Sequence, residues 1–145
     1  TSEFATWVDS KIQNIALKRK KCLILDLDNT LWGGVLGEEG INGIQIGGDY
    51  PGKAFLYFQE ALSALSKEGI ILSVCSKNNE EDVFDAWEQN PFMVLRKKDF
   101  VAIRINWNDK ASNIVELSKE LNIGLDSMVF IDDNPAEREL VKQIK

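Results

Sequence analysis

Four carboxylates occur in two pairs, and each pair directly follows an apolar run. Asp26 and Asp28 come after the first run, and Asp132 and Asp133 come after another run far downstream. Such runs are typical of buried parallel strands, whose carboxyl ends meet at the sheet edge where open α/β proteins bind ligands. Four acidic groups there would repel one another without a cation, and Mg²⁺ prefers oxygen ligands of this kind. The two pairs therefore predict a Mg²⁺ site.

Side chains that can bind phosphate also lie near the ends of the apolar runs. Ser76 ends a third apolar run, Thr30 follows the first acidic pair, and Lys110 stands at the start of a predicted helix. Hydroxyl, ammonium and helix N-terminal amide groups all donate to phosphate oxygens, although a lone Ser or Thr more often completes a turn. The combination favours a site that holds both a metal ion and a phosphate.

Strands and helices alternate in the predicted secondary structure. Apolar runs predict strands at residues 21–25, 70–75, 101–105 and 128–131. Periodicity and capping residues predict helices over about 7–21, from about 55 to a stop at Gly69, from Asn78 to near Asn90, from Asp109 to Gly124, and from Asn134 onward. This alternation predicts an α/β fold with a doubly wound, Rossmann-like, mostly parallel sheet and helices on both faces.

Two units are expected along the chain. Residues 1–20 are predicted to form an N-terminal helix, and residues 21–145 to form the catalytic domain. The sequence stops within the last predicted helix, which leaves room for a further edge strand in a longer parent protein. The first residue is not methionine, and we expect the sequence to be part of a larger protein.

A glycine-rich segment follows the first acidic pair. Residues 33–52 hold eight of the ten glycines, a density that disfavours a helix and favours tight turns between short strands. We expect a small β-hairpin flap here, with strands at 34–36 and 44–46. The segments on either side of Ser76 are too short to contain a large cap domain, so the predicted site is open.

The composition excludes several other functions. The 145 residues carry a net charge of -6 and no histidine, which argues against nucleic acid as a partner and excludes histidine-based triads. No apolar stretch approaches the roughly 20 residues of a membrane span. Cys22 and Cys75 fall in predicted buried strands without a disulfide spacing pattern, which indicates a reducing compartment, the cytoplasm.

The order of the polar groups resembles the four motifs of the haloacid dehalogenase superfamily. The matching positions are the segment 26–30, which reads DLDNT, followed by Ser76, Lys110 and the pair 132–133. The surrounding sequence is similar to the FkbH-like branch of the capless phosphatase subfamily IIIC, in segments 28–34, 74–78, 106–107 and 130–135. The resemblance runs from about Lys21 to the C-terminus. Four ordered motifs in a βαβ context are far more specific than one.

The resemblance implies a role for each matching residue. Asp26 would attack phosphorus and form an aspartyl phosphate, while Asp28 would protonate the leaving group and later deprotonate water. Lys110 completes the implied catalytic set. The implied metal ligands are Asp26, Asp28 (through its backbone carbonyl), Asp132 and Asp133, with either of the last two as the direct ligand. The implied phosphate-binding residues are Thr30, Ser76, Lys77, Asn78 and Lys110.

The expected function is that of a Mg²⁺-dependent phosphatase or phosphotransferase that acts through an aspartyl phosphate on a small or carrier-bound phosphorylated substrate. The FkbH-like resemblance implies an alternative, the transfer of a glyceryl group from an acyl phosphate of the bisphosphoglycerate type to the thiol of an acyl carrier protein. In that reaction Cys75 could carry the acyl group, although a strand cysteine is more often a core residue. A phosphate-accepting receiver or interaction domain is a third alternative, which leaves the segment 28–30 unexplained.

Three further side chains near the motifs have two interpretations each. Asn78 is expected first to cap the following helix and second to contact phosphate. Trp32 and Trp107 flank the motifs, and we expect both to be core residues rather than walls of a pocket.

Overall fold

The computed structural model describes residues 4, 6–11 and 20–144. Residues 6–11 are helical, in agreement with the start of the predicted N-terminal helix, and residues 12–19 of that prediction lie outside the described residues. The division into an N-terminal helix and a catalytic domain stays a prediction. Within the described part of the chain, no helix is long and apolar enough to cross a membrane.

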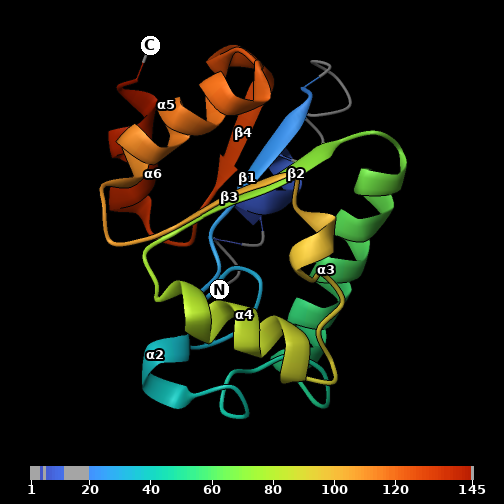
Figure 1. The fold of residues 1–145 in the computed structure, drawn as a ribbon. Helices are drawn as coiled ribbons and strands as arrows, with labels where there is room; N and C mark the ends of the chain where they lie inside the picture. The colour runs from blue at the N-terminus through green and yellow to red at the C-terminus, as the bar shows by residue number, and fades with distance from the viewer. Residues whose placement is uncertain (1–3, 5, 12–19, 145) are drawn as a thin grey trace.

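A four-stranded parallel sheet forms the centre of the fold (Figure 1). Its strands are β1 (Cys22–Leu25), β2 (Ile71–Ser76), β3 (Ala102–Ile105) and β4 (Met128–Ile131), in the spatial order β3-β2-β1-β4. Each pairing is parallel, and each strand lies within one residue of its predicted range. The predicted α/β fold is confirmed. The strand order reverses between β1 and β4, which is the kind of switch point where such sheets bind ligands.

Helices cover both faces of the sheet, as predicted. On one side lie α3 (Gly52–Lys67) and α4 (Glu80–Gln89), and on the other lie α5 (Lys110–Leu121) and α6 (Pro135–Lys142) (Figure 1). Two short 3₁₀ turns, at 97–99 and 125–127, precede β3 and β4.

The central strand β1 is apolar on both sides because both of its faces are covered. Leu23 and Leu25 belong to a hydrophobic cluster that includes residues of α3 and α4, whereas Cys22 and Ile24 belong to a second cluster with residues of α5. This double burial explains why the strand reads as a continuous apolar run rather than an alternating one.

Capping side chains set the start of the two helices next to the site. Asp109 accepts a hydrogen bond from the Ser112 amide at 2.9 Å, and Asn134 accepts one from the Ala136 amide at 3.0 Å. Both caps agree with the sequence prediction. Asp109 thereby places the next residue, Lys110, in the first turn of α5.

Two predicted helix boundaries are wrong. The N-cap of α4 is Asn79 rather than Asn78, and α5 ends at Leu121 rather than at Gly124. The second difference has a local cause, because Asn122 adopts the left-handed conformation with a φ of 55°. Asn is one of the few residues other than Gly that tolerates this conformation, so it ends the helix before the glycine is reached.

The predicted hairpin flap is only partly present. Gly33 and Gln45 form an isolated antiparallel bridge at its base, with N–O distances of 2.9 and 2.8 Å. The predicted strands at 34–36 and 44–46 are both absent: α2 (Leu36–Glu39) takes the place of the first, and only the bridge at Gln45 is present at the second. Leu36 is buried in the main core, and the Glu39 carboxylate accepts a hydrogen bond from the Val35 amide. These contacts stabilise a helical turn that the glycine count alone does not reveal.

Gln59 of α3 connects the segment after β1 to the segment before β3. Its side chain is completely buried, and its Nε2 atom donates to the Leu31 carbonyl at 2.7 Å. Its Oε1 atom accepts from the amides of Val94 and Leu95 at 3.2 and 2.9 Å. A buried polar group that is satisfied in this way is costly to remove, so Gln59 fixes the loop that carries the first motif.

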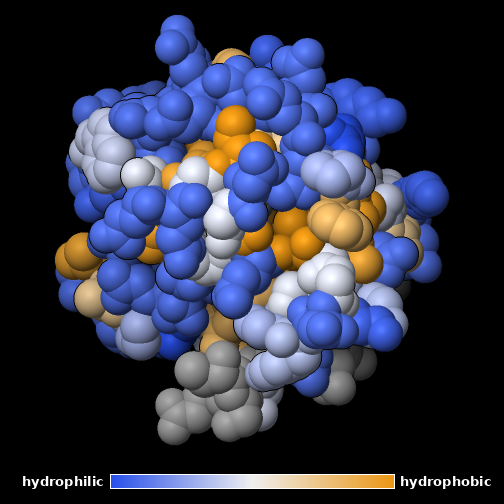
Figure 2. Space-filling view, turned by 90° about the horizontal axis from the view of Figure 1, so that it is seen from below, coloured by the Kyte–Doolittle hydropathy of each residue, from blue (hydrophilic) through white to orange (hydrophobic). Residues whose placement is uncertain are grey.

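No large domain is inserted within residues 20–144, so the carboxyl edge of the sheet is covered only by the flap and neighbouring loops. The flap and α2 lie at the bottom of Figure 1. Seen from that side, the surface is mainly hydrophilic, and hydrophobic side chains show through near its middle (Figure 2).

Candidate active site

The pairing of β1 with β4 makes Asp26 and Asp132 neighbours. Leu25 lies opposite Ile131 in this pairing, so the residues that follow them, Asp26 and Asp132, also lie side by side at the end of the two strands. The Asp26 amide donates to the Ile131 carbonyl at 3.0 Å, which joins the turn after β1 to β4. Two carboxylates from distant motifs are therefore brought together at the switch point of the sheet.

The Lys110 ammonium lies between these carboxylates. Its Nζ atom is 3.2 Å from Asp26 Oδ1 and 2.5 Å from Asp132 Oδ2. The exposed fraction is 6% for Lys110, 7% for Asp26 and 1% for Asp132. Buried charges need partners, and removal of Lys110 would leave both carboxylates uncompensated. Side chains from three predicted motifs thus form one buried ion-pair cluster.

Burial changes the acid–base behaviour of this cluster. Desolvation raises the pKa of the Asp26 carboxyl to about 7, although the Lys110 ammonium acts in the opposite direction. Burial alone would lower the pKa of Lys110, but Asp26 and Asp132 outweigh it, and the pKa of Lys110 is raised. Lys110 therefore stays charged at neutral pH, whereas Asp26 titrates in the neutral range when no other cation is bound.

Asp28 is held by three hydrogen-bond donors. Its Oδ1 atom accepts from the Trp32 indole at 3.1 Å and from the Leu36 amide at 3.0 Å. Its Oδ2 atom accepts from the side-chain amide of Asn78 at 3.1 Å. Asp28 is therefore the point where the first motif, the flap and the turn after β2 are connected.

Two buried hydroxyls are left without a hydrogen bond. Within the described residues, the buried side-chain polar atoms that lack a partner are Ser76 Oγ, Thr30 Oγ1 and Trp87 Nε1. Buried polar atoms are usually satisfied, so an unpartnered one calls for an explanation. Ser76 and Thr30 were both predicted to bind phosphate, and oxygens of a bound phosphate would satisfy such donors.

Lys77 and Asn78 have other partners than the phosphate-binding role predicts. The Lys77 ammonium lies 3.8 Å from the Glu137 carboxylate of α6, and its side chain is 40% exposed. Asn78 is buried and donates to Asp28. A contact of either side chain with phosphate stays a prediction.

The two acidic residues after β4 differ in what they contact. Asp132 Oδ2 accepts from Lys110, and its Oδ1 atom accepts from the Asn134 amide at 2.8 Å. Asp133 is half-buried, and its side chain makes no hydrogen bond or ion pair with any described residue. Asp133 is thus the carboxylate of this pair that is available to a ligand.

The donor set fits Mg²⁺ rather than a metal that needs a complete protein cage. Within residues 4, 6–11 and 20–144, no three acidic or cysteine side chains lie close enough to hold a metal by themselves. Mg²⁺ usually keeps several waters and takes one or two carboxylates together with substrate phosphate oxygens. Asp26 and Asp133 would supply such carboxylates, and the unpartnered hydroxyls of Ser76 and Thr30 would donate to a phosphate.

Sequence reasoning missed several contacts of the site. Trp32 is a core residue, as expected, but its indole also donates to Asp28. Trp107 is 68% exposed, so its predicted place in the core is wrong; its indole donates to Asn79 at 3.0 Å in a surface loop.

The Arg138 guanidinium donates to the Asp132 carbonyl at 2.7 Å. In the sequence, only its position four residues after the helix cap Asn134 indicates that Arg138 lies near the end of β4.

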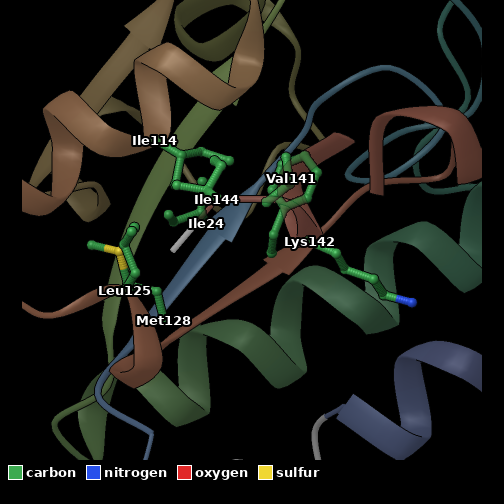
Figure 3. A pocket seen from close by; sticks show the side chains of 8 residues that line it. Ile24, Ile114, Leu125, Met128, Val141, Lys142 and Ile144 are labelled. Atoms are coloured by element: carbon green, nitrogen blue, oxygen red, sulfur yellow. The ribbon is translucent and has the colours of Figure 1, made fainter. Parts of the chain in front are cut away.

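An apolar pocket on the α5–α6 side of the sheet is separate from these groups. It has a volume of about 200 Å³, and Figure 3 shows the side chains that surround it. Its lining residues are Ile24, Ile114, Leu125, Met128, Phe130, Val141, Lys142 and Ile144. The lining contains no carboxylate and none of the predicted site residues, so the chemical groups of the chain gather elsewhere.

A crystal structure with bound Mg shares the fold. It is the crystal structure of the N-terminal part of the protein BF1531 from Bacteroides fragilis, which contains a phosphatase domain complexed with Mg. The TM-score is 0.84 and the sequence identity 54%, and the match covers 86% of the present chain. It spans only 33% of the solved chain. No curated protein sequence matches.

The fold and the site define a phosphatase domain of the haloacid dehalogenase type. The model of the NLI interacting factor-like phosphatase family matches residues 21–143. The chain belongs to this family, which confirms the resemblance at the level of the superfamily and the expectation of a phosphohydrolase. The receiver-domain alternative finds no support in this match.

The raised pKa of Asp26 predicts a pH-dependent stability in the absence of divalent metal. Because the carboxyl holds its proton more tightly in the folded protein, its stabilising contribution is complete below about pH 4 and is lost as pH rises to about 7. The free energy of unfolding should fall over this window by at most about 1.4 kcal/mol per pH unit. Urea unfolding with a chelator present measures this, and Asp26→Asn should flatten the profile. An equally steep profile in the variant would assign the effect to another group.

Proposed function

We propose that this chain is a Mg²⁺-dependent phosphatase whose nucleophile is Asp26. The observation that carries the proposal is the buried cluster in which Lys110 lies between Asp26 and Asp132 at the switch point of the sheet. The Mg in the solved relative and the family match support the choice of metal and reaction class. An aspartyl-phosphate route is the covalent mechanism that these side chains can perform without histidine.

The proposed reaction has two steps. First, an Asp26 oxygen attacks phosphorus, the bond from phosphorus to the leaving oxygen breaks, and Asp28 gives that oxygen a proton. Second, water attacks the aspartyl phosphate, Asp28 takes a proton from the water, and inorganic phosphate leaves as Asp26 is regenerated. The charged Lys110 and the hydroxyls of Ser76 and Thr30 would stabilise negative charge on the phosphate oxygens.

Three groups would hold the metal: the Asp26 carboxylate, the backbone carbonyl of Asp28 and the Asp133 carboxylate. Bound Mg²⁺ supplies positive charge that offsets the repulsion between the phosphate and the attacking carboxylate. We propose Asp133 as the direct ligand because the Asp132 carboxylate is paired with the Lys110 ammonium, whereas the Asp133 side chain has no partner among the described residues. Asp132 would then serve to hold Lys110 in place.

Replacing the nucleophile tests the mechanism. Asp26→Asn should abolish phosphate release from p-nitrophenyl phosphate in the presence of Mg²⁺, because an amide does not form an acyl phosphate. The fold should remain, since the change creates no cavity. Asp126→Asn, a matched change at an exposed aspartate, should keep the parent rate. Turnover by Asp26→Asn at the rate of the parent would refute the proposal.

Substitution of the two acids after β4 should affect two different quantities, the metal-free stability and the response to Mg²⁺. Asp132→Asn removes the closer of the two carboxylates that pair with Lys110, and the loss of this charged hydrogen bond should destabilise the metal-free protein by about 1.5–3 kcal/mol. Asp133→Asn should change metal-free stability by less than about 0.5 kcal/mol but should remove most of the increase in melting temperature caused by Mg²⁺. Calorimetry of both variants with and without millimolar Mg²⁺ separates the roles. An unchanged Mg²⁺ response in Asp133→Asn would show that this residue is not a ligand.

The glyceryl-transfer alternative gains no support at Cys75. Its side chain is completely buried, and burial raises the pKa of the thiol to about 12. An acyl-carrying cysteine needs an accessible thiolate. The FkbH-like branch stays a prediction, and the reaction that we propose for this chain is hydrolysis.

Acyl transfer through Cys75 can be tested directly. Incubation with an acyl phosphate should leave no thiol-labile adduct on the protein, as judged by intact mass. Cys75→Ala should retain phosphatase activity, and Cys22→Ala, at an equally buried thiol, serves as the control for core disruption. An adduct that maps to Cys75 would restore the transferase alternative.

The open edge of the sheet supports a small or carrier-bound phosphorylated substrate, including one attached to an acyl carrier protein. Within residues 20–144 no inserted domain restricts access to Asp26. The two cysteines are free and buried, which supports the cytoplasm as the compartment.

A further inference from the structure

We infer that Asn78 is a positioning residue that presents one particular oxygen of Asp28 to the leaving group. The inference rests on the proposed function, since it takes Asp28 as the general acid. Asn78 is 4% exposed, and its Nδ2 atom donates to Asp28 Oδ2 at 3.1 Å. This contact joins residues 50 positions apart and comes from the turn directly after β2.

The two oxygens of Asp28 are not equivalent. Oδ1 accepts from both the Trp32 indole and the Leu36 amide, whereas Oδ2 accepts only from Asn78. A carboxylate oxygen has two lone-pair sites, so Oδ1 is full and Oδ2 keeps one site. The transferable proton of Asp28 is therefore carried on Oδ2. Asn78 can hold this oxygen without competing for the proton, because an amide nitrogen donates and does not accept.

A donor on the second oxygen is needed to fix the plane of the carboxyl group. The terminal torsion of an aspartate side chain, about its Cβ–Cγ bond, is broad, and the donors at Oδ1 constrain only one of the two oxygens directly. The contact at Oδ2 removes this freedom. Proton transfer depends on such alignment, and a displacement of about 1 Å costs about 100-fold in rate.

A purely structural role as a helix cap does not account for Asn78. The N-cap of α4 is Asn79, and neither asparagine makes a side-chain capping bond to that helix. The amide of Asn78 is instead directed at the acid.

The proton transfer is balanced without a further reactant. The bond between phosphorus and the leaving oxygen breaks, and its electron pair stays on that oxygen. The Oδ2–H bond of Asp28 breaks while a new O–H bond forms on the leaving oxygen. Asp28 is left as a carboxylate, to which the hydrogen bond from Asn78 becomes charge-assisted and stronger.

The experiment compares leaving groups. We would measure kcat/KM with Mg²⁺ for p-nitrophenyl phosphate, whose leaving group needs no proton, and for phenyl and alkyl phosphates, whose leaving groups do. Asn78→Ala should lose about 100-fold on the phenyl and alkyl esters and less than about tenfold on the p-nitrophenyl ester. Asn79→Ala is the matched control, because the side chain of this exposed neighbour bonds only to Asp82 and Trp107 among the described residues. An equal loss on every ester would overturn the inference.

Two further variants keep the test decisive if Asn78→Ala folds poorly. Asn78→Ser retains a donor and should recover part of the loss on alkyl phosphates, whereas no recovery in a folded variant counts against positioning. In an Asp28→Asn background, Asn78→Ala should cause no additional loss, and an additive loss would contradict action through Asp28. A parent protein inactive on all esters would instead refute the proposed function itself.

Discussion

The ammonium of Lys110 between Asp26 and Asp132 is the interaction on which the site depends. Three buried charges are tolerable only because each has an opposite partner within a few ångströms. That requirement constrains the surrounding fold: β1 must pair with β4 in one register, and α5 must begin at Lys110. The Asp109 cap sets the start of that helix, so a surface hydrogen bond contributes to the placement of a buried ion.

This cluster also explains why the site is suited to a divalent cation. One lysine faces two buried carboxylates, and the pKa of Asp26 is raised because its burial outweighs the single positive charge. A further cation at this edge would favour the charged form of Asp26, which is the form that the proposed mechanism requires. In the proposed mechanism, electrostatics rather than a cage of ligands therefore couples the metal to Asp26.

Asp28 has a different environment, because neutral donors rather than charges surround it. The donors come from the loop after β1, from the flap and from the turn after β2, so the position of the acid depends on all three. Gln59 also fixes the loop after β1, because it hydrogen-bonds to the Leu31 carbonyl and to the segment before β3. The flap, although short, thus helps to position Asp28 and does not only cover the edge of the sheet.

The sequence by itself determined the strands, the helices that carry the motifs and the identity of the main charged groups. Those features depend on local patterns: continuous apolar runs where both faces of the sheet are covered, and capping residues such as Asp109 and Asn134. Only the tertiary structure decided that Asn78 donates to Asp28 and that Asp132 is paired while Asp133 has no partner among the described residues. It also decided that Trp107 is exposed and that Leu36 begins a helical turn. The physical reason is that these outcomes depend on side-chain partners distant in sequence, as in the contact between Asn78 and Asp28 across 50 positions. Local propensity carries no information about such partners until the sheet has brought them together.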